Sequence, residues 1–180
     1  MKYLKLYGSQ IELCNEGIRQ YLKPKSEDDI LKSISYLSPD EKLEKSCKYG
    51  FLKIAKIALE EGANPKVNGN HPLRLACTYG YINIVKLLLQ DNRTIPYIFD
   101  NQPLRNAIFF NHIDIVKLLL QDKRVDPSDR DNESIKHSYE SGNFDMVKLL
   151  LKDDRVKKSL PTYLFDKYTK LKLNESIRQY

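Results

Sequence analysis

One short phrase occurs three times in the chain, at a fixed spacing of 31 residues: NIVKLLLQD begins at Asn83, DIVKLLLQD at Asp114 and DMVKLLLKD at Asp145. Three further columns of residues keep nearly the same spacing over four segments. They are Leu43, Leu73, Leu104 and Ile135; Gly50, Gly80, Asn111 and Gly142; and Ile54, Ile84, Ile115 and Met146. A period of about 30 residues predicts an array of stacked units, because no single unit buries its apolar face alone.

Each unit is predicted to be a pair of short helices. In the second unit Pro72 suits the start of a first helix, where its missing N–H has no intrahelical partner. Gly80 suits the end of that helix, because glycine accepts a left-handed backbone, and Asn111 in the same column is the usual substitute. The second helix, INIVKLLLQ, is apolar on most of its surface. We therefore expect neighbouring units to cover it on several sides.

The stretches HPLRLACTYGYINIVKLLL and QPLRNAIFFNHIDIVKLLL resemble the ankyrin-repeat pattern, which is TPLHxAA, then G-H, then VVxLLLxxGAD. EEGANP in the first unit is similar to the family's loop. The 31-residue variant is similar to arrays abundant in giant viruses of amoebae and in some amoebal genomes. The resemblance covers about residues 40–156. It implies an all-α helix-turn-helix solenoid of about four repeats with helical caps, the repeats lying at 40–68, 69–98, 99–128 and 129–156.

Several columns depart from the family pattern. In the family, the Thr and His of TPLH form hydrogen bonds within and between repeats. Here the two positions hold His71 with Arg74, Gln102 with Arg105, and Glu133 with Lys136. The departures predict that polar bracing between the repeats is altered, most of all in the fourth, where Ser134 replaces the expected proline.

The flanks are expected to cap the array, because an exposed end would leave apolar surface bare. Residues 1–39 are predicted to form an N-terminal helical cap, with helices beginning after Ser26 and Ser38, the second through a capping box to Glu41. Residues 157–180 are predicted to be a basic C-terminal capping segment. The seven-residue segments NEGIRQY at 15–21 and NESIRQY at 174–180 differ at one position, and we have no physical account of this similarity.

The tail also raises an alternative function. Leu160–Pro161 begins a stretch of aromatic and aliphatic residues. Viral ankyrin proteins sometimes end in an F-box-like segment that recruits a ubiquitin ligase, and such segments often open with Leu-Pro. An adaptor that links a bound target to a ubiquitin ligase through the tail is therefore the alternative to simple capping.

The net charge of +6 raises the question of nucleic-acid binding. Residues 40–156 contain 18 lysines and arginines against 17 aspartates and glutamates, whereas residues 157–180 contain 6 against 2. The arginines at 93, 124 and 155 each have an aspartate two positions earlier. Because a phosphate-tracking surface needs cations without counter-charges, we expect the repeats not to bind nucleic acid.

The resemblance implies a non-enzymatic module that binds a protein partner through its concave face and inter-repeat loops. Aromatic residues occupy the column before the Gly/Asn column, which in the family faces the concave groove. Such rings serve as binding anchors or cover gaps between adjacent first helices, and both readings stay open. The predicted partner-binding residues are Tyr49, Arg74, Thr78, Tyr79, Arg105, Phe109 and Phe110.

No catalytic, metal or cofactor site is predicted. Cys47 and Cys77 share a column that packs a small buried residue in the family. DRDNESIKHSYE at 129–140 partly matches a calcium loop but lacks the required glycine, and it aligns as the start of the fourth repeat. No apolar run is long enough to cross a bilayer. The three cysteines fit no CxxC pattern, which favours an intracellular, cytoplasmic location (the host cytoplasm if the protein is viral). We expect a monomer.

Overall fold

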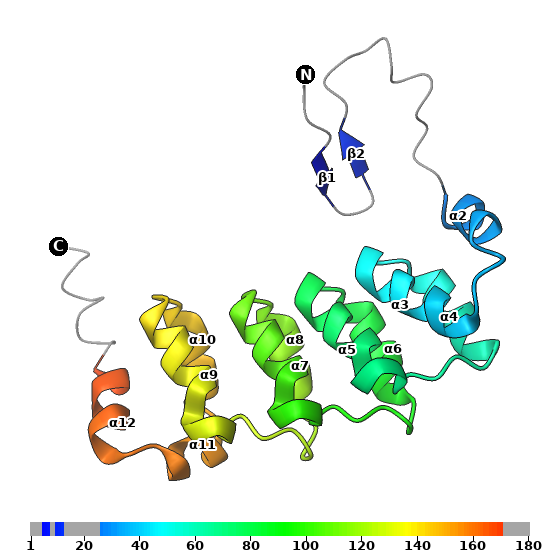
Figure 1. The fold of residues 1–180 in the computed structure, drawn as a ribbon. Helices are drawn as coiled ribbons and strands as arrows, with labels where there is room; N and C mark the ends of the chain where they lie inside the picture. The colour runs from blue at the N-terminus through cyan, green and yellow to red at the C-terminus, as the bar shows by residue number, and fades with distance from the viewer. Residues whose placement is uncertain (1–4, 8–9, 13–25, 171–180) are drawn as a thin grey trace. The chain divides into compact units, whose positions relative to one another are not determined.

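The computed structural model describes residues 5–7, 10–12 and 26–170 (Figure 1). The chain divides into two compact units, Met1–Thr94 and Ile95–Tyr180, and each is described by itself. The first unit contains strands β1 (Lys5–Tyr7) and β2 (Gln10–Glu12) and helices α2 (Glu27–Ser33), α3 (Pro39–Tyr49), α4 (Leu52–Glu60), α5 (Val67–Tyr79) and α6 (Ile82–Gln90). The second unit contains α7 (Ile98–Phe109), α8 (Ile113–Leu120), α9 (Asp129–Glu140), α10 (Phe144–Leu150), α11 (Asp154–Ser159) and α12 (Thr162–Thr169).

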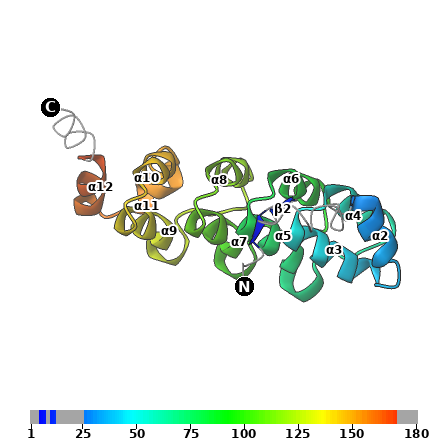
Figure 2. The same cartoon turned by 90° about the horizontal axis from the view of Figure 1, so that it is seen from above.

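The predicted pairs of helices are confirmed in both units. In each repeat a first helix (α3, α5, α7 or α9) is followed after a short turn by a second helix (α4, α6, α8 or α10). Within a unit the first helices pack side by side, α3 against α5 and α7 against α9. Figure 2 shows α7 and α9 on one side of the second unit and α8 and α10 on the other. The fold is thus a helical repeat array of about four units, as the periodicity predicted.

The periodic apolar columns form the core. All four members of the leucine/isoleucine column on the first helices are fully buried, and the isoleucine/methionine column on the second helices is at most 2% exposed. Both columns therefore lie in the core of every repeat, which explains why the sequence keeps them at a fixed spacing. Burying a leucine or isoleucine side chain stabilises the fold by about 1.5–3 kcal/mol.

Two helix starts in the first unit agree with the sequence prediction. Ser38 caps α3: its Oγ accepts from the N–H of Glu41 at 3.3 Å, and Glu41 accepts from the N–H of Ser38 at 2.9 Å. This hydrogen bonding lowers the pKa of Glu41 below its usual value. Ser26 caps α2 in the same way, with Asp29 as its partner. Both capping boxes satisfy N–H groups that the helices leave without a partner.

The turn between the two helices of each repeat is left-handed, as predicted. The φ angles of Gly50, Gly80, Asn111 and Gly142 are 83°, 80°, 59° and 73°. At Gly50 a side chain would also collide with the repeat that follows, because a Cβ there would lie 2.5 Å from Cε1 of Tyr81. Glycine at this position therefore serves both the turn and the packing of one repeat on the next.

A second left-handed segment was not predicted. Three consecutive residues with φ between 49° and 65° lie near the start of α5, α7 and α9. The regular part of each first helix begins after them. They are Asn68–Gly69–Asn70, Phe99–Asp100–Asn101 and Arg130–Asp131–Asn132. Asparagine, aspartate and glycine tolerate this conformation, whereas Phe99 and Arg130 adopt it at a cost of about 1–2 kcal/mol each.

The flanks contain both expected and unexpected elements. Helix α2 packs near the start of α4, where Glu27 accepts from the N–H of Lys53 at 2.9 Å and Asp28 pairs with the Lys53 ammonium at 2.6 Å. Strands β1 and β2 pair in antiparallel register, Lys5 opposite Glu12, whereas only helix was expected in residues 1–39. The similar seven-residue segments at 15–21 and 174–180 lie outside the described residues.

The last two helices lie against the fourth repeat. Tyr168 of α12 is 4% exposed, and its ring lies 4.5 Å from the ring of Tyr139, centroid to centroid. Lys167 places its ammonium 4.8 Å from the same Tyr139 ring. Leu160, the leucine of the Leu-Pro dipeptide, is buried. Residues 154–169 therefore cover apolar surface of the fourth repeat. None of the helices between residues 26 and 170 has the length and apolar content that crossing a bilayer requires.

Candidate protein-binding grooves

Two hollows lie between neighbouring first helices, one in each unit. The first groove, between α3 and α5, has a volume of about 430 Å³ and is lined by Glu41, Glu44, Lys45, Lys48, Tyr49, His71, Leu75 and Tyr79. The second groove, between α7 and α9, has a volume of about 340 Å³ and is lined by Arg105, Asn106, Ile108, Phe109, Arg130, Glu133, Ser134 and His137. Both are hollows on the surface that the sequence analysis selected for partner binding.

The structure distributes the predicted binding residues unevenly between these grooves. Tyr49 and Tyr79 both line the first groove, and Arg105 and Phe109 line the second. The other three predicted residues, Arg74, Thr78 and Phe110, line neither groove. The four aromatic residues of the set are 45–63% exposed, so each presents a large part of its ring to solvent.

The two predicted arginines make bonds to their own repeats. Arg74 donates from Nε to the carbonyl of Gly69 at 3.2 Å and from Nη2 to that of Asn68 at 3.0 Å. Arg105 donates from Nη1 to the carbonyls of Phe99 and Asp100. Both guanidinium groups thus bind carbonyls of the left-handed segment that precedes their helix. Such charge-assisted bonds stabilise a strained backbone, so these arginines have a structural role whatever else they contact.

In the first groove one acidic residue of α3, Glu44, contacts two residues of α5. Glu44 of α3 accepts from Nδ2 of Asn68 at 2.8 Å, and its Oε1 lies 3.0 Å from Nδ1 of His71. One turn further along α3, the Lys48 ammonium lies 5.4 Å from the ring centroid of Tyr49. The wall that α3 contributes is therefore charged along its length.

In the second groove charged residues occupy one end and aromatic rings the other. The Nε of Arg105 and an Nη1 of Arg130 lie 3.6 and 3.4 Å from the same oxygen, Oε2 of Glu133. At the other end the rings of Phe109 and His137 stack with centroids 5.0 Å apart and an interplanar angle of 15°. Phe110 meets Phe109 edge to face at 5.0 Å. A groove with two such ends can contact two kinds of side chain at once.

A second position with ring side chains lies beside the column of Tyr49, Tyr79 and Phe110. Phe51, Tyr81 and His112 each follow the left-handed residue of their repeat, and each lies near the ring two positions earlier. The centroid distances are 6.1 Å for Tyr49–Phe51, 6.4 Å for Tyr79–Tyr81 and 6.5 Å for Phe110–His112. The sequence analysis missed these partners, although their 30- and 31-residue spacing would have revealed them.

Comparison with protein families agrees with this architecture. A model described as "Ankyrin repeats (3 copies)" matches residues 15–98, and a model described as "Ankyrin repeat" matches residues 99–132. The chain belongs to the ankyrin-repeat family. No curated protein matches it closely enough to count as a relative. The match begins upstream of α3 and so includes part of the segment expected to cap the array.

The ankyrin repeats of this chain are braced by a column of buried asparagines that sequence reasoning missed. Asn70, Asn101 and Asn132, each the third residue of a left-handed segment, are at most 4% exposed. Nδ2 of Asn101 donates to Asp129 at 2.7 Å, and its Oδ1 accepts from the N–H of Asp126 at 3.0 Å. Asp129 is the first residue of the next repeat, and Asp126 lies in the loop that leads to it. The bonds of Asn101 thus join the third repeat to the start of the fourth, and the 31-residue spacing of the asparagines was visible in the sequence.

The loop arginines, which are Arg93 and Arg124 in loops and Arg155 in the first turn of α11, are each paired with an aspartate two positions earlier. In Asp91–Arg93, Asp122–Arg124 and Asp153–Arg155 the aspartate accepts from the backbone N–H of the arginine, and Nη2 lies 2.6 Å from Oδ2. The hydrogen bonds from the arginine side chain hold the pKa of each aspartate below its usual value. Each of these arginines therefore has a counter-charge beside it, and the expectation that the repeats do not bind nucleic acid stays a prediction.

The cysteines of the first two repeats lie in the core. Cys47 and Cys77 are free thiols with no exposed surface. Burial raises the pKa of Cys47 to about 12 and raises that of Cys77 as well, so both remain protonated and unreactive near neutral pH. Within the described part of the chain, no three His, Cys, Asp or Glu residues cluster as metal ligands would. Residues 129–140, which partly resemble a calcium loop, form the start of the fourth repeat and α9.

Proposed function

We propose that this protein is a non-enzymatic binding module that holds a protein partner on the exposed side of its first helices, with the grooves and inter-repeat loops as contact regions. Ankyrin repeats mediate protein–protein interaction, and the present chain has the family's fold. The observation that carries the more specific proposal is the pair of grooves. Each contains a half-exposed aromatic residue, Tyr49 or Phe109, among charged side chains.

Exposed rings on rigid helices favour binding. Aromatic residues are enriched among the side chains that contribute most to interface affinity, and polar residues around them exclude water. Tyr49 and Phe109 lie on helices whose backbones are fixed by buried columns and left-handed turns. A partner therefore meets a surface that loses little conformational freedom on binding.

The setting of the interaction forms part of the proposal. We propose that the partner is a protein rather than a nucleic acid, because the loop arginines are paired with aspartates. The free thiols of Cys47 and Cys77 are compatible with a reducing, intracellular compartment. The burial of Leu160 and Tyr168 favours capping over the adaptor role for the described part of the tail.

The proposal is tested by selecting peptides on the full chain from a random phage-displayed library and mapping the selected peptides by ¹H–¹⁵N chemical-shift changes. We expect the largest changes on α3, α5, α7 or α9. Tyr49→Ala or Phe109→Ala should weaken peptides that map to the matching groove, whereas Tyr36→Ala and Tyr163→Ala, which remove exposed rings elsewhere, should not. Peptides that map only to α4, α6, α8 and α10 would show the proposal to be wrong.

A further inference from the structure

The residues of the second groove point to a class of partner. We propose that the groove between α7 and α9 binds a segment with an acidic and an aromatic side chain two residues apart. This inference rests on the proposed function, since it names the ligand chemistry of one of the two grooves. It is argued from charge, ring geometry and spacing.

The residues that line the groove have an excess of one positive charge, and the adjoining hollow on α9 adds Lys136, Asp131 and Glu140. Among the residues that line the groove, Arg105 and Arg130 carry two positive charges and Glu133 one negative charge. The distances of 3.6 and 3.4 Å to Glu133 exceed the 2.7–2.9 Å of a well-formed charge-assisted hydrogen bond. The loop arginines of the same chain, by contrast, reach 2.6 Å. Arg105 also donates to the carbonyls of Phe99 and Asp100, and its side chain is 20% exposed, whereas that of Arg130 is 50% exposed. Arg130 is therefore the group that can accept a second carboxylate from a partner, with Arg105 adding positive charge beside it.

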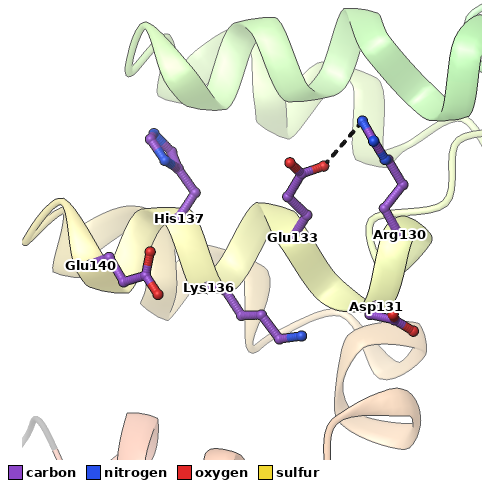
Figure 3. Close-up of a pocket in the computed structure, with 6 residues that line it drawn as sticks. All are labelled: Arg130, Asp131, Glu133, Lys136, His137 and Glu140. Carbon is purple, nitrogen blue, oxygen red and sulfur yellow. Dashed lines mark ion pairs between the residues drawn. The ribbon is translucent and has the colours of Figure 1, made fainter.

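Figure 3 shows how α9 presents this end. Arg130, Glu133 and His137 project from one side of the helix, whereas Asp131, Lys136 and Glu140 project from the other. All six residues line a hollow of about 640 Å³ on α9, and the three residues of the first side also line the groove with α7. The side chains of Arg130 and Glu133 are each 50% exposed, so an incoming carboxylate can approach Arg130 from solvent without displacing a buried group.

The aromatic end supplies a flat apolar platform. Phe109 is 63% exposed although it stacks on His137 and contacts Phe110. A ring from the partner can pack on its open face or edge, in the offset or edge-to-face geometries that aromatic pairs prefer. Phe109 and the adjacent Phe110, 49% exposed, form a continuous apolar patch, and such a patch surrounded by polar residues marks a binding surface.

The two ends are separated by one helical turn. Arg105 and Phe109 are four residues apart on α7, and Glu133 and His137 are four residues apart on α9, a rise of about 6 Å. In an extended peptide, side chains two residues apart lie on the same face and are also separated by about 6–7 Å. An acidic residue and an aromatic residue at that spacing therefore match the charged and aromatic ends together.

Single-stranded nucleic acid also presents negative charges and rings, but the groove favours a peptide. Proteins that track a phosphate backbone line their path with many cations. The second groove has one net positive charge along a single helical turn. We therefore treat nucleic-acid binding as an outcome that would contradict the inference.

The test uses the full chain and fluorescein-labelled peptides at low salt. The acidic probe has two glutamates, the second two residues before a phenylalanine. One comparison peptide has glutamines for the glutamates, another has serine for the phenylalanine, and oligothymidylate is the competing polyanion. We expect the acidic probe to bind at least about fivefold more tightly than either comparison peptide, in keeping with one charge-assisted contact and one ring contact.

Two variants with the same change in net charge locate the site. Arg130→Glu should weaken the acidic probe about fivefold or more, because it removes a direct contact. Lys123→Glu, on an exposed loop of the same unit outside the groove, should change binding less than twofold. Phe109→Ser should abolish the preference for phenylalanine over serine, which keeps the inference testable if Arg130→Glu does not fold.

Several results would overturn the inference. Equal binding of the glutamate and glutamine probes, equal effects of Arg130→Glu and Lys123→Glu, or tighter binding of oligothymidylate would each do so. In those cases, library peptides that map to either groove would leave the proposed function intact. If no library peptide maps to the first helices, the proposed function itself fails.

Discussion

The two grooves occupy equivalent places between first helices, yet their linings differ in charge and in ring content. Where the first groove has Glu44 and Lys48 on its leading helix, the second has Arg105 and Phe109. The following helix of the first groove, α5, contributes His71 and Leu75. At the equivalent positions α9 contributes Glu133 and His137 to the second groove. One backbone arrangement thus presents an acidic residue at a given point in one unit and a basic residue at that point in the other.

This difference shows that separate columns of the repeat serve folding and recognition. The buried columns and the left-handed turn are the same in chemistry from repeat to repeat, because the packing of one unit on the next depends on them. The groove columns vary freely, because their side chains face solvent and contribute little to the core. A partner that distinguishes the two grooves must do so through these variable columns.

The largest expected effect concerns the brace beside each groove. Asn101→Ala removes the amide that donates to Asp129 and the oxygen that accepts from the N–H of Asp126. We therefore expect the free energy of unfolding to fall by about 2–3 kcal/mol. Asn68→Ala, beside the first groove, removes one exposed bond to Glu44. Both asparagines have a left-handed backbone, with φ of 54° and 50°. The cost of forcing alanine into this conformation is therefore the same in the two variants. Urea denaturation measures both, and equal losses would show that the buried brace is not special.

A second comparison uses the turns of the two units. Gly50→Ala and Gly142→Ala both force a left-handed alanine, at a cost of about 1–2 kcal/mol. Only at Gly50 does the new Cβ collide with a ring, that of Tyr81, because nothing lies within 4 Å of the corresponding position at Gly142. We expect Gly50→Ala to lower the free energy of unfolding by about 1 kcal/mol more than Gly142→Ala. Equal losses in thermal or urea unfolding would show that Tyr81 moves aside without cost.

The aromatic end of the second groove offers a smaller effect, on binding rather than folding. Phe109→Ala should weaken the acidic-aromatic probe by about 1 kcal/mol, because a partner ring loses its platform. The converse variant, Lys48→Phe, places a ring at the equivalent point of the first groove but leaves Glu44 beside it. Fluorescence anisotropy should therefore show no new site for the acidic probe. Gain of such a site would show that a ring alone decides what a groove binds.

The smallest effect concerns acid stability. The pKa values of Asp91, Asp122 and Asp153 are lowered by their arginines, so these carboxylates contribute stability above the unfolded-state pKa. That contribution is lost as the pH falls through the lower folded-state pKa. One pair, Asp91–Arg93, lies in the first unit and two lie in the second. The pKa values of Glu41, at the start of α3, and Asp154, at the start of α11, are also lowered, which brings these carboxylates among the described residues to two in the first unit and three in the second. Hydrogen exchange should therefore show a somewhat greater loss of protection on acidification in the second unit than in the first. Arg124→Gln should lower stability at neutral pH and make the loss on acidification in the second unit smaller, because the pKa of Asp122 then differs less between the folded and unfolded states. An unchanged profile would contradict the assignment.

The sequence predicted the fold from features that are periodic and the binding surface from features that are local. Leu73, Ile84 and Gly80 each recur at a fixed spacing, so the core, the helix pairs and the turns followed directly. The left-handed segments did not follow, because Phe99 and Arg130 are poor residues for that conformation and tertiary contacts impose it. Strands β1 and β2 were missed because their short stretches show no strong alternation.

The candidate site was predictable in part for a related reason. Exposed rings at a helix end could be read from the column of Tyr49, Tyr79 and Phe110. The role of Arg74 and Arg105 could not, because their bonds go to carbonyls of a segment whose conformation was unknown. Residues 133 and 137 were also missed, since their importance depends on which helix lies opposite. The columns of the sequence predict which residues share one face of a helix. Which faces of neighbouring helices pack together can be known only from the structure.

The contact between Tyr139 and Tyr168 limits how such an array can be lengthened. An added repeat inserted upstream of α9 would leave this contact intact, because α9 and α12 would still meet. A repeat added after α10 would have to displace α12 and provide its own side chain to cover Tyr139. Growth of the array by duplication, in evolution or in design, is therefore expected to be tolerated at internal positions and resisted at the junction with α12.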